Sequence, residues 1–124
     1  MRIAMTKIQL KRAYDPPAAT DGFRVLMDRL WPRGLTKEEL PYDLWAKNLA
    51  PSNNLRKWFH EDPAERWPEF KRKYLAELKL DEGLDEFVAT VKNQTTVTLV
   101  FGAKDIQHNQ AEVLKKYLET LMQA

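Results

Sequence analysis

One short segment near the end of the chain restricts the fold more than any other. Residues 95–102 are β-branched and apolar almost throughout, which is the composition of a strand covered on both faces. Residues 25–27 form a second, shorter apolar run of the same kind. Buried strands of this type occur in parallel sheets whose faces carry helices. The two runs therefore predict an α/β fold, with the later strand at the centre of the sheet.

Periodicity elsewhere in the chain predicts one more strand and four helices. Residues 6–12 alternate polar and apolar side chains, as a half-buried strand does. Capping signals and apolar residues at helical spacing predict helices over residues 52–60, 62–79, 83–92 and 109–122. We therefore expect a single domain over residues 1–124, with a small, mainly parallel sheet of about three strands flanked by helices.

Three parts of this pattern are less regular. Pro68 predicts a turn that interrupts the helix beginning at Asp62. Residues 40–51 fit either a strand or a short helix, because their apolar residues match both periods. The loop over residues 13–22, rich in proline, allows either an antiparallel connection or a short parallel crossover.

Composition narrows the classes of function. The chain has no cysteine, which excludes disulfides, thiolate metal sites and a cysteine nucleophile. Only two histidines are present, without H-E-x-x-H spacing or a glycine-rich nucleotide motif, so we expect no metal and no cofactor. No run approaches the roughly 20 apolar residues of a membrane span, and no signal peptide is evident. A cytoplasmic protein without a membrane partner is the expectation.

Charge is distributed unevenly along the chain. The net charge is +2, with +5 over residues 1–60 and −3 over residues 61–124. The basic half contains residues 23–36, where an apolar strand passes directly into a charged turn. An excess of positive charge around such a turn favours an anionic ligand.

Residues 28–34 place one acid and two arginines at a strand end. Asp28 and Arg29 end the apolar run, Trp31 precedes a proline that favours an extended backbone, and Arg33 precedes a glycine. Open α/β sheets bind ligands at the carboxyl ends of their strands, so these side chains are candidates for a site. The alternative is structural, because a pairing of Asp28 with either arginine would serve only to fix the turn.

The late strand has a similar exit over residues 102–109. If the two strands are parallel neighbours, Asp105 and His108 approach Arg29 and Arg33 in one crevice. Arginine binds carboxylate or phosphate groups with two hydrogen bonds, histidine transfers protons, and an aspartate orients the histidine. The alternative is again structural, because Asp, Asn and His are common in capping loops.

Several phrases of the sequence resemble the YeaO-like family of uncharacterised bacterial proteins, grouped with domain of unknown function 488. These phrases are K-R-A-Y-D at residues 11–15, R-V-L-M-D-R-L-W-P-R-G at 24–34, A-P-S at 50–52, L-R-K-W-F-H at 55–60, and the segments 74–78 and 98–109. The resemblance covers nearly the whole chain and implies a compact α/β fold without naming an activity. The chain departs from the broader group's pattern in having Asp28 and Arg29 adjacent and asparagine after His108. The positions that match the family's motifs are Asp28, Arg29, Trp31, Arg33, Lys37, Trp58, His60, Asp105, His108 and Asn109.

Our leading hypothesis is a crevice between loops 28–34 and 105–109 that binds a phosphorylated or carboxylated small molecule, with hydrolase or transferase activity as one option. In this hypothesis His108 transfers a proton, and Asp28 or Asp105 orients the imidazole ring of His108. The predicted ligand-binding residues are Arg29, Arg33, Trp31, Lys37, His60 and Asn109. One alternative is a nucleic-acid-binding module that uses the basic first half and Trp31. Another is a protein that binds a protein partner without chemistry.

Overall fold

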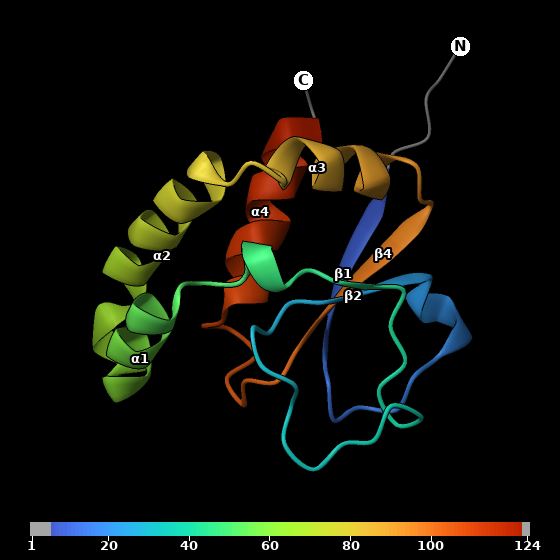
Figure 1. Cartoon of the computed structure of the whole chain (residues 1–124), viewed down its shortest axis with the longest axis horizontal. Helices are drawn as coiled ribbons and strands as arrows, with labels where there is room; N and C mark the ends of the chain where they lie inside the picture. Colours follow the sequence, from blue (N-terminus) through green and yellow to red (C-terminus); the bar gives the residue numbers. More distant parts are fainter. Residues whose placement is uncertain (1–5, 123–124) are drawn as a thin grey trace.

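Four parallel strands form the centre of the computed structural model, which describes residues 6–122 (Figure 1). They are β1 (Lys7–Arg12), β2 (Phe23–Leu26), β3 (Leu44–Trp45) and β4 (Thr96–Phe101), in the order β1-β4-β2-β3. Each pairing is parallel, and β4 lies between β1 and β2. The predicted α/β class and the central position of the late strand are therefore confirmed, and the loop over residues 13–22 belongs to a parallel crossover.

The sheet has one strand more than the sequence pattern indicates. β3 is only two residues long and lies within the ambiguous segment 40–51. It forms because Leu44 and Trp45 pair with Val25 and Leu26 of β2. A strand this short depends on its neighbour, so its own residues do not identify it.

Four helices pack together with one face of the sheet in a single core (Figure 1). They are α1 (Asn53–Glu61), α2 (Pro63–Leu80), α3 (Leu84–Lys92) and α4 (Gln110–Met122), with 3-10 turns at η1 (Ala19–Asp21) and η2 (Lys47–Leu49). The predicted caps are present: Ser52, Asp62 and Asn109 each accept a backbone N–H through a side-chain oxygen. In Figure 1 the α1–α2 pair extends sideways beyond the sheet, and α2 packs against α4. No helix within residues 6–122 is long and apolar enough to cross a membrane.

The prediction that Pro68 interrupts its helix is wrong, because α2 is continuous from Pro63 to Leu80. Proline lacks an N–H, so position 68 loses one hydrogen bond of the helix. Three apolar side chains on the same helix, Phe70, Tyr74 and Leu78, are each at most 1% exposed. Their burial outweighs a single lost backbone bond and keeps the helix in place.

The second face of the sheet is covered by irregular chain. Leu26 and Val100 point to this face and pack with Ala13 and Leu40 in a separate small core. In Figure 1 the segments that connect β1 to β2 and β2 to β3 run below the strands. Helices therefore flank one face of the sheet, and the loop of residues 27–43 covers much of the other.

A buried ion-pair network holds this irregular cover to the sheet. Asp21 bonds Arg24 at 2.5 Å and Lys11 at 2.8 Å, and its backbone oxygen accepts the Thr98 hydroxyl at 2.6 Å. Arg24 also donates to the carbonyl of Pro41 at 2.7 Å. Burial acts to raise the pKa of Asp21, but the hydrogen bonds from Lys11, the Ala18 amide and Arg24 together hold that pKa below its usual value.

Candidate functional site

The exits of β2 and β4 meet at the side chain of Asp28. The N–H of Gly102, directly after β4, donates to Asp28 Oδ2 at 2.9 Å. The amide of Gln110, at the start of α4, donates to Asp28 Oδ1 at 2.6 Å. Because β2 and β4 are parallel neighbours, their carboxyl ends lie side by side, as predicted. Asp28 pairs with neither Arg29 nor Arg33.

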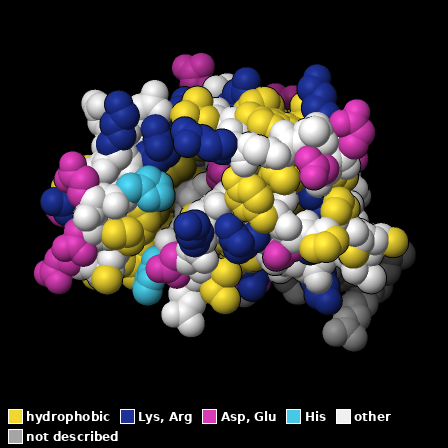
Figure 2. All heavy atoms as spheres, turned by 90° about the horizontal axis from the view of Figure 1, so that it is seen from below, with side chains coloured by type: hydrophobic (Ala, Val, Ile, Leu, Met, Phe, Trp, Pro, Cys, Tyr) yellow, Lys and Arg dark blue, Asp and Glu magenta, His cyan; other side chains and the backbone are white. Residues whose placement is uncertain are grey.

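A cavity of about 280 Å³ opens beside this contact. Both strand exits and helices α1, α2 and α4 contribute to its wall. We call it the Asp28 cavity, and it is lined by Tyr14, Asp28, Arg29, Leu30, Trp31, Pro32, Arg33, Ala50, Pro51, Arg56, Phe59, His60, Phe70, Gly102, Ala103 and Gln110. Figure 2 shows basic side chains and both histidines around a hollow on one face of the molecule. The volume is near the lower end of that of sites for small molecules, about 300 Å³.

Three arginines line the cavity. Arg29 is held by the carbonyl oxygens of Ala50 and Pro51, each 3.1 Å from a guanidinium nitrogen. Arg33 is exposed, and its backbone oxygen accepts the Tyr14 hydroxyl at 2.9 Å. Within residues 6–122, none of Arg29, Arg33 and Arg56 forms an ion pair with a carboxylate.

Arg56 differs from the other two in having a buried donor that the described residues leave without a partner. It comes from α1, and its Nε atom is buried without a hydrogen-bond partner in the part of the chain that the structure describes. A guanidinium group has five N–H donors and a permanent charge, so a buried donor left unused costs free energy. The charge of Arg56 also acts on its neighbours in the wall, Asp28 and His60.

Asp28 is the one carboxylate among the lining residues. Burial raises its pKa, although the hydrogen bonds from Gly102 and Gln110 and the charge of Arg56 act in the opposite direction. Its environment therefore opposes ionisation. The cavity thus combines a single acid with three guanidinium groups.

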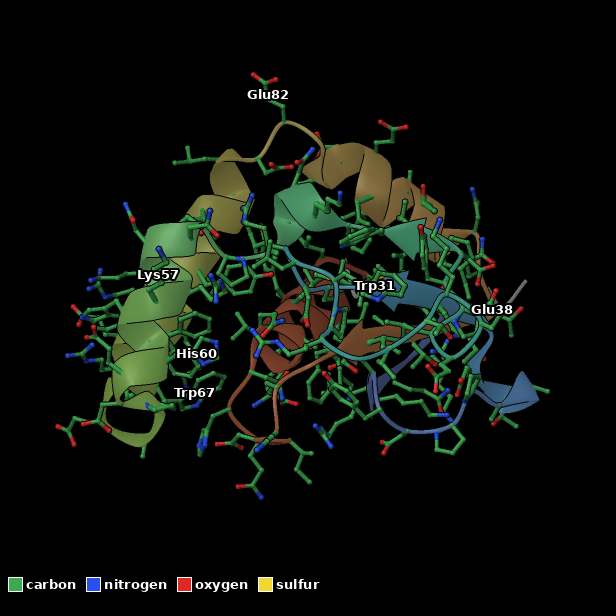
Figure 3. The ribbon with its side chains drawn as sticks, turned by 60° about the horizontal axis from the view of Figure 1, so that its bottom comes forward. Trp31, Glu38, Lys57, His60, Trp67 and Glu82 are labelled. Carbon is green, nitrogen blue, oxygen red and sulfur yellow. The ribbon has the colours of Figure 1, made fainter. Side chains whose placement is uncertain are left out.

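His60 also lines the cavity, four residues after Arg56 on α1. Partial burial and the charge of Arg56 lower its pKa, which favours the neutral imidazole. In Figure 3, His60 and Trp67 lie on the side of the α1–α2 pair that faces the centre of the molecule.

Trp31 is part of an aromatic cluster. Its ring is in edge-to-face contact with Tyr42 and Trp45, at centroid distances of 6.1 and 5.6 Å. Its Nε1 donates to the backbone oxygen of Leu35 at 2.7 Å. The residue lines the Asp28 cavity, but these contacts also give it a packing role in the smaller core.

Asp105, His108 and Asn109 lie outside the wall of the cavity. His108 Nδ1 is 2.8 Å from Asp105 Oδ2, and its ring is in edge-to-face contact with Trp67. Burial acts to raise the pKa of Asp105, but hydrogen bonds from the amides of Gln107 and His108 and from the imidazole hold it below its usual value. Asn109 is buried and caps α4. These contacts form a capping loop, which is the structural alternative considered for this segment.

Lys37 also lies away from the cavity wall. It is exposed in the helical turn that follows Thr36, where Thr36 and Glu39 form the predicted capping box with bonds of 2.9 and 3.2 Å. The structure therefore brings together Asp28, Arg29, Trp31, Arg33 and His60, and it separates them from Lys37, Asp105, His108 and Asn109.

Two polar residues that act on Asp28 in the cavity wall, Arg56 and Gln110, are not among the site residues predicted from the sequence. Arg56 precedes His60 by four residues, and residues at this spacing share one face of a helix. A helix that places His60 at the site therefore also places Arg56 near it, and this spacing is visible in the sequence. For Gln110 no local signal exists, because its contact with Asp28 depends on how α4 packs against the sheet. Within residues 6–122, no three His, Cys, Asp or Glu side chains gather as ligands for a metal ion.

Together these features define an α/β domain with a basic cavity at the carboxyl ends of its parallel strands. The chain belongs to the family DUF488-N3i, described as the "Inactive DUF488-N3 subclade", whose model matches residues 7–124. This membership confirms the resemblance found in the sequence motifs.

Relatives from two bacterial genera match most of the chain. It is 42% identical to the uncharacterized protein YeaO of Escherichia coli (strain K12) over 114 residues, which are 92% of this chain and 98% of that protein. It is 35% identical to an uncharacterized protein of Mycobacterium tuberculosis (strain ATCC 25618 / H37Rv) over 113 residues, 91% of this chain and 94% of that protein. An uncharacterized protein of Mycobacterium bovis (strain ATCC BAA-935 / AF2122/97) matches with the same figures. No solved structure matches the chain.

Proposed function

We propose that this protein binds a small phosphorylated or carboxylated molecule in the Asp28 cavity, without converting it. The observation that carries the proposal is the set of three lining arginines that have no carboxylate partner within residues 6–122. Guanidinium groups bind carboxylate and phosphate oxygens through short, charge-assisted hydrogen bonds. An anion at this place would supply acceptors that the protein itself does not provide.

The positions of the three arginines support a shared ligand. Arg29 uses two of its five donors on backbone oxygens, which fixes the orientation of the rest. Arg56 is partly buried where α1 lines the cavity, and water screens its charge less there than at the surface. Arg33 lies on the exposed rim, where it would attract an anion from solution.

Two observations support binding without turnover. The lining residues include no serine, threonine, cysteine or lysine, and both oxygens of Asp28, the one lining carboxylate, already accept hydrogen bonds from Gly102 and Gln110. The predicted proton-transfer pair, Asp105 and His108, lies outside the cavity wall. The family description, which calls the subclade inactive, agrees with a binding role.

The test is a thermal-shift and calorimetric comparison of inorganic phosphate, phosphate monoesters and short carboxylates. We expect at least one of these anions to stabilise the wild-type protein, and Arg56→Gln and Arg33→Ala to reduce that stabilisation. Arg72→Gln on the exposed side of α2 is the matched control and should behave as the wild type. Equal stabilisation of all four proteins, or no effect of any anion, would overturn the proposal.

An assay for turnover accompanies this test. Incubation with the phosphate monoester that binds best should release no inorganic phosphate. Release that depends on His108 would show that the protein is a hydrolase and that the capping loop rearranges toward the cavity. Release that persists in His108→Ala would assign the chemistry to other residues. Either result would contradict the non-catalytic role.

A further inference from the structure

We infer that the ligand of the Asp28 cavity is a zwitterion, a molecule in which an ammonium group lies a few bonds from the phosphate or carboxylate group. This inference rests on the proposed function, because it assumes that the arginines hold the anionic end. It concerns the role of Asp28 in the same wall.

Asp28 has acceptor capacity that the protein leaves unused. An ionised carboxylate offers about four lone-pair sites on its two oxygens. Gly102 and Gln110 each donate one hydrogen bond, one to each oxygen. Within residues 6–122, Asp28 forms no ion pair, although it lies in a wall with three guanidinium groups. An accessible, hydrogen-bonded carboxylate of this kind suits a donor group on a ligand.

The charges of the cavity discriminate between classes of ligand. A simple anion would interact favourably with Arg29, Arg33 and Arg56 but would be repelled by the ionised form of Asp28, the form that a ligand ammonium group stabilises. A simple cation would be attracted by ionised Asp28 but repelled by the three arginines. A ligand that carries both charges places each one beside its complement, which is how charged sites select partners.

The apolar part of the cavity wall suits a short hydrocarbon segment between the two charged groups of the ligand. Phe59, Phe70 and Pro51 are buried apolar residues that line the same cavity. The space of about 280 Å³ is small for a ligand site. We therefore expect the two charged groups of the ligand to be separated by a few methylene groups.

The experiment compares probes that share a head group and differ only in the second group. The phosphate series is ethyl phosphate, 2-hydroxyethyl phosphate, 2-aminoethyl phosphate and 3-aminopropyl phosphate. The carboxylate pair is propanoate and 3-aminopropanoate, which distinguishes the two sources of negative charge. By calorimetry, we expect an amino compound to bind wild-type protein at least about tenfold tighter than its partner without the amine, with the hydroxyl compound between them.

Asp28→Asn tests the residue itself, because asparagine keeps the shape and removes the charge. We expect the preference for the amino compound to fall to about twofold or less, with ethyl phosphate bound at least as well as before. Glu82→Gln is the matched control; Figure 3 shows Glu82 far from His60, on the turn between α2 and α3, and this variant should keep the wild-type preference.

The outcomes separate this inference from the proposed function. Arginine-dependent binding of ethyl phosphate or propanoate with no gain from the amine would overturn the zwitterion and leave the anion site intact. Absence of binding for every probe would overturn both. If Asp28→Asn does not fold, the paired probes on the wild-type protein still decide, because equal affinities would contradict the inference.

Discussion

Gly102 and Asp28 are in such close contact that no side chain fits at position 102. The Gly102 amide donates to Asp28 Oδ2 at 2.9 Å, and a Cβ on residue 102 would lie 2.5 Å from the same oxygen. This contact connects the exits of the two neighbouring strands in the wall of the cavity. It makes glycine a packing requirement at the site.

Gly102→Ala should therefore displace the Asp28 side chain. We expect the free energy of unfolding to fall by about 1–3 kcal/mol, as in other overpacked sites, because Asp28 is also held by Gln110. Urea denaturation measures the change. Gly83→Ala is the control, since a Cβ there meets only the Asp81 carboxylate at 3.2 Å and the backbone is helical. Equal stability of Gly102→Ala and wild type would show that Asp28 moves freely.

The raised pKa of Asp28 predicts a distinctive dependence of stability on pH. The folded protein binds the Asp28 proton more tightly than the unfolded chain does, so the contribution of this group is most favourable below its unfolded pKa, near 3.8. That contribution is lost as the pH rises through the folded pKa. The stability of wild type minus that of Asp28→Asn should therefore decrease as the pH increases across this window, and then become constant.

Denaturation of both proteins between about pH 3 and about pH 7 measures this difference. A difference that grows with pH would mean that the ionised form of Asp28 is the one that folding favours. The pKa shift assigned to burial would then have the wrong sign.

The buried network of Asp21 should contribute strongly to stability. Asp21 and Arg24 are 3% and 6% exposed, so Asp21→Asn leaves the Arg24 charge buried without its partner. Breaking such a pair costs about 3–5 kcal/mol, which chemical denaturation will detect. Glu69→Gln, which breaks exposed contacts with Arg72 and Lys73, should cost less than about 1 kcal/mol. Similar losses for the two variants would contradict the importance of burial.

The two prolines of α2 should respond in opposite ways to alanine. Pro63 occupies the first turn, where its ring favours helix initiation, so Pro63→Ala should leave stability unchanged or lower. Pro68 lies inside the helix, and Pro68→Ala restores an N–H donor. We expect Pro68→Ala to raise the free energy of unfolding by about 1 kcal/mol, after allowance for the more flexible unfolded chain. A loss of stability in Pro68→Ala would show that the helix requires the local geometry of proline.

Local signals in the sequence predict the elements that local forces create. The strand at residues 96–101 and the caps at Ser52, Asp62 and Asn109 depend on the composition and hydrogen bonding of nearby residues, and they are present as predicted. β3 and the continuity of α2 past Pro68 depend on pairing and packing with distant segments. Composition and periodicity of one segment do not specify which distant segment it will contact, so these two features could not be predicted from the sequence pattern.

The residues of the candidate site also differ in whether local sequence or long-range packing places them there. Asp28, Arg29 and Arg33 line the cavity because they follow directly from the end of a buried strand. Arg56 reaches it only through the packing of α1 beside the sheet, which a single sequence does not specify. Asp105 and His108 have side chains suited to chemistry, yet local hydrogen bonds engage both in the loop before α4. Residue type alone does not separate these two uses.

The irregular cover of the sheet has a consequence for how binding would be detected. Residues 28–33 form part of the cavity wall, and the same loop continues to Leu40, which covers Leu26 and Val100 on the second face. Release of this loop would expose the cavity and the central strands to solvent in a single opening event. Occupancy of the cavity should therefore slow amide hydrogen exchange in β2 and β4, so that these buried strands report on a ligand that they do not contact.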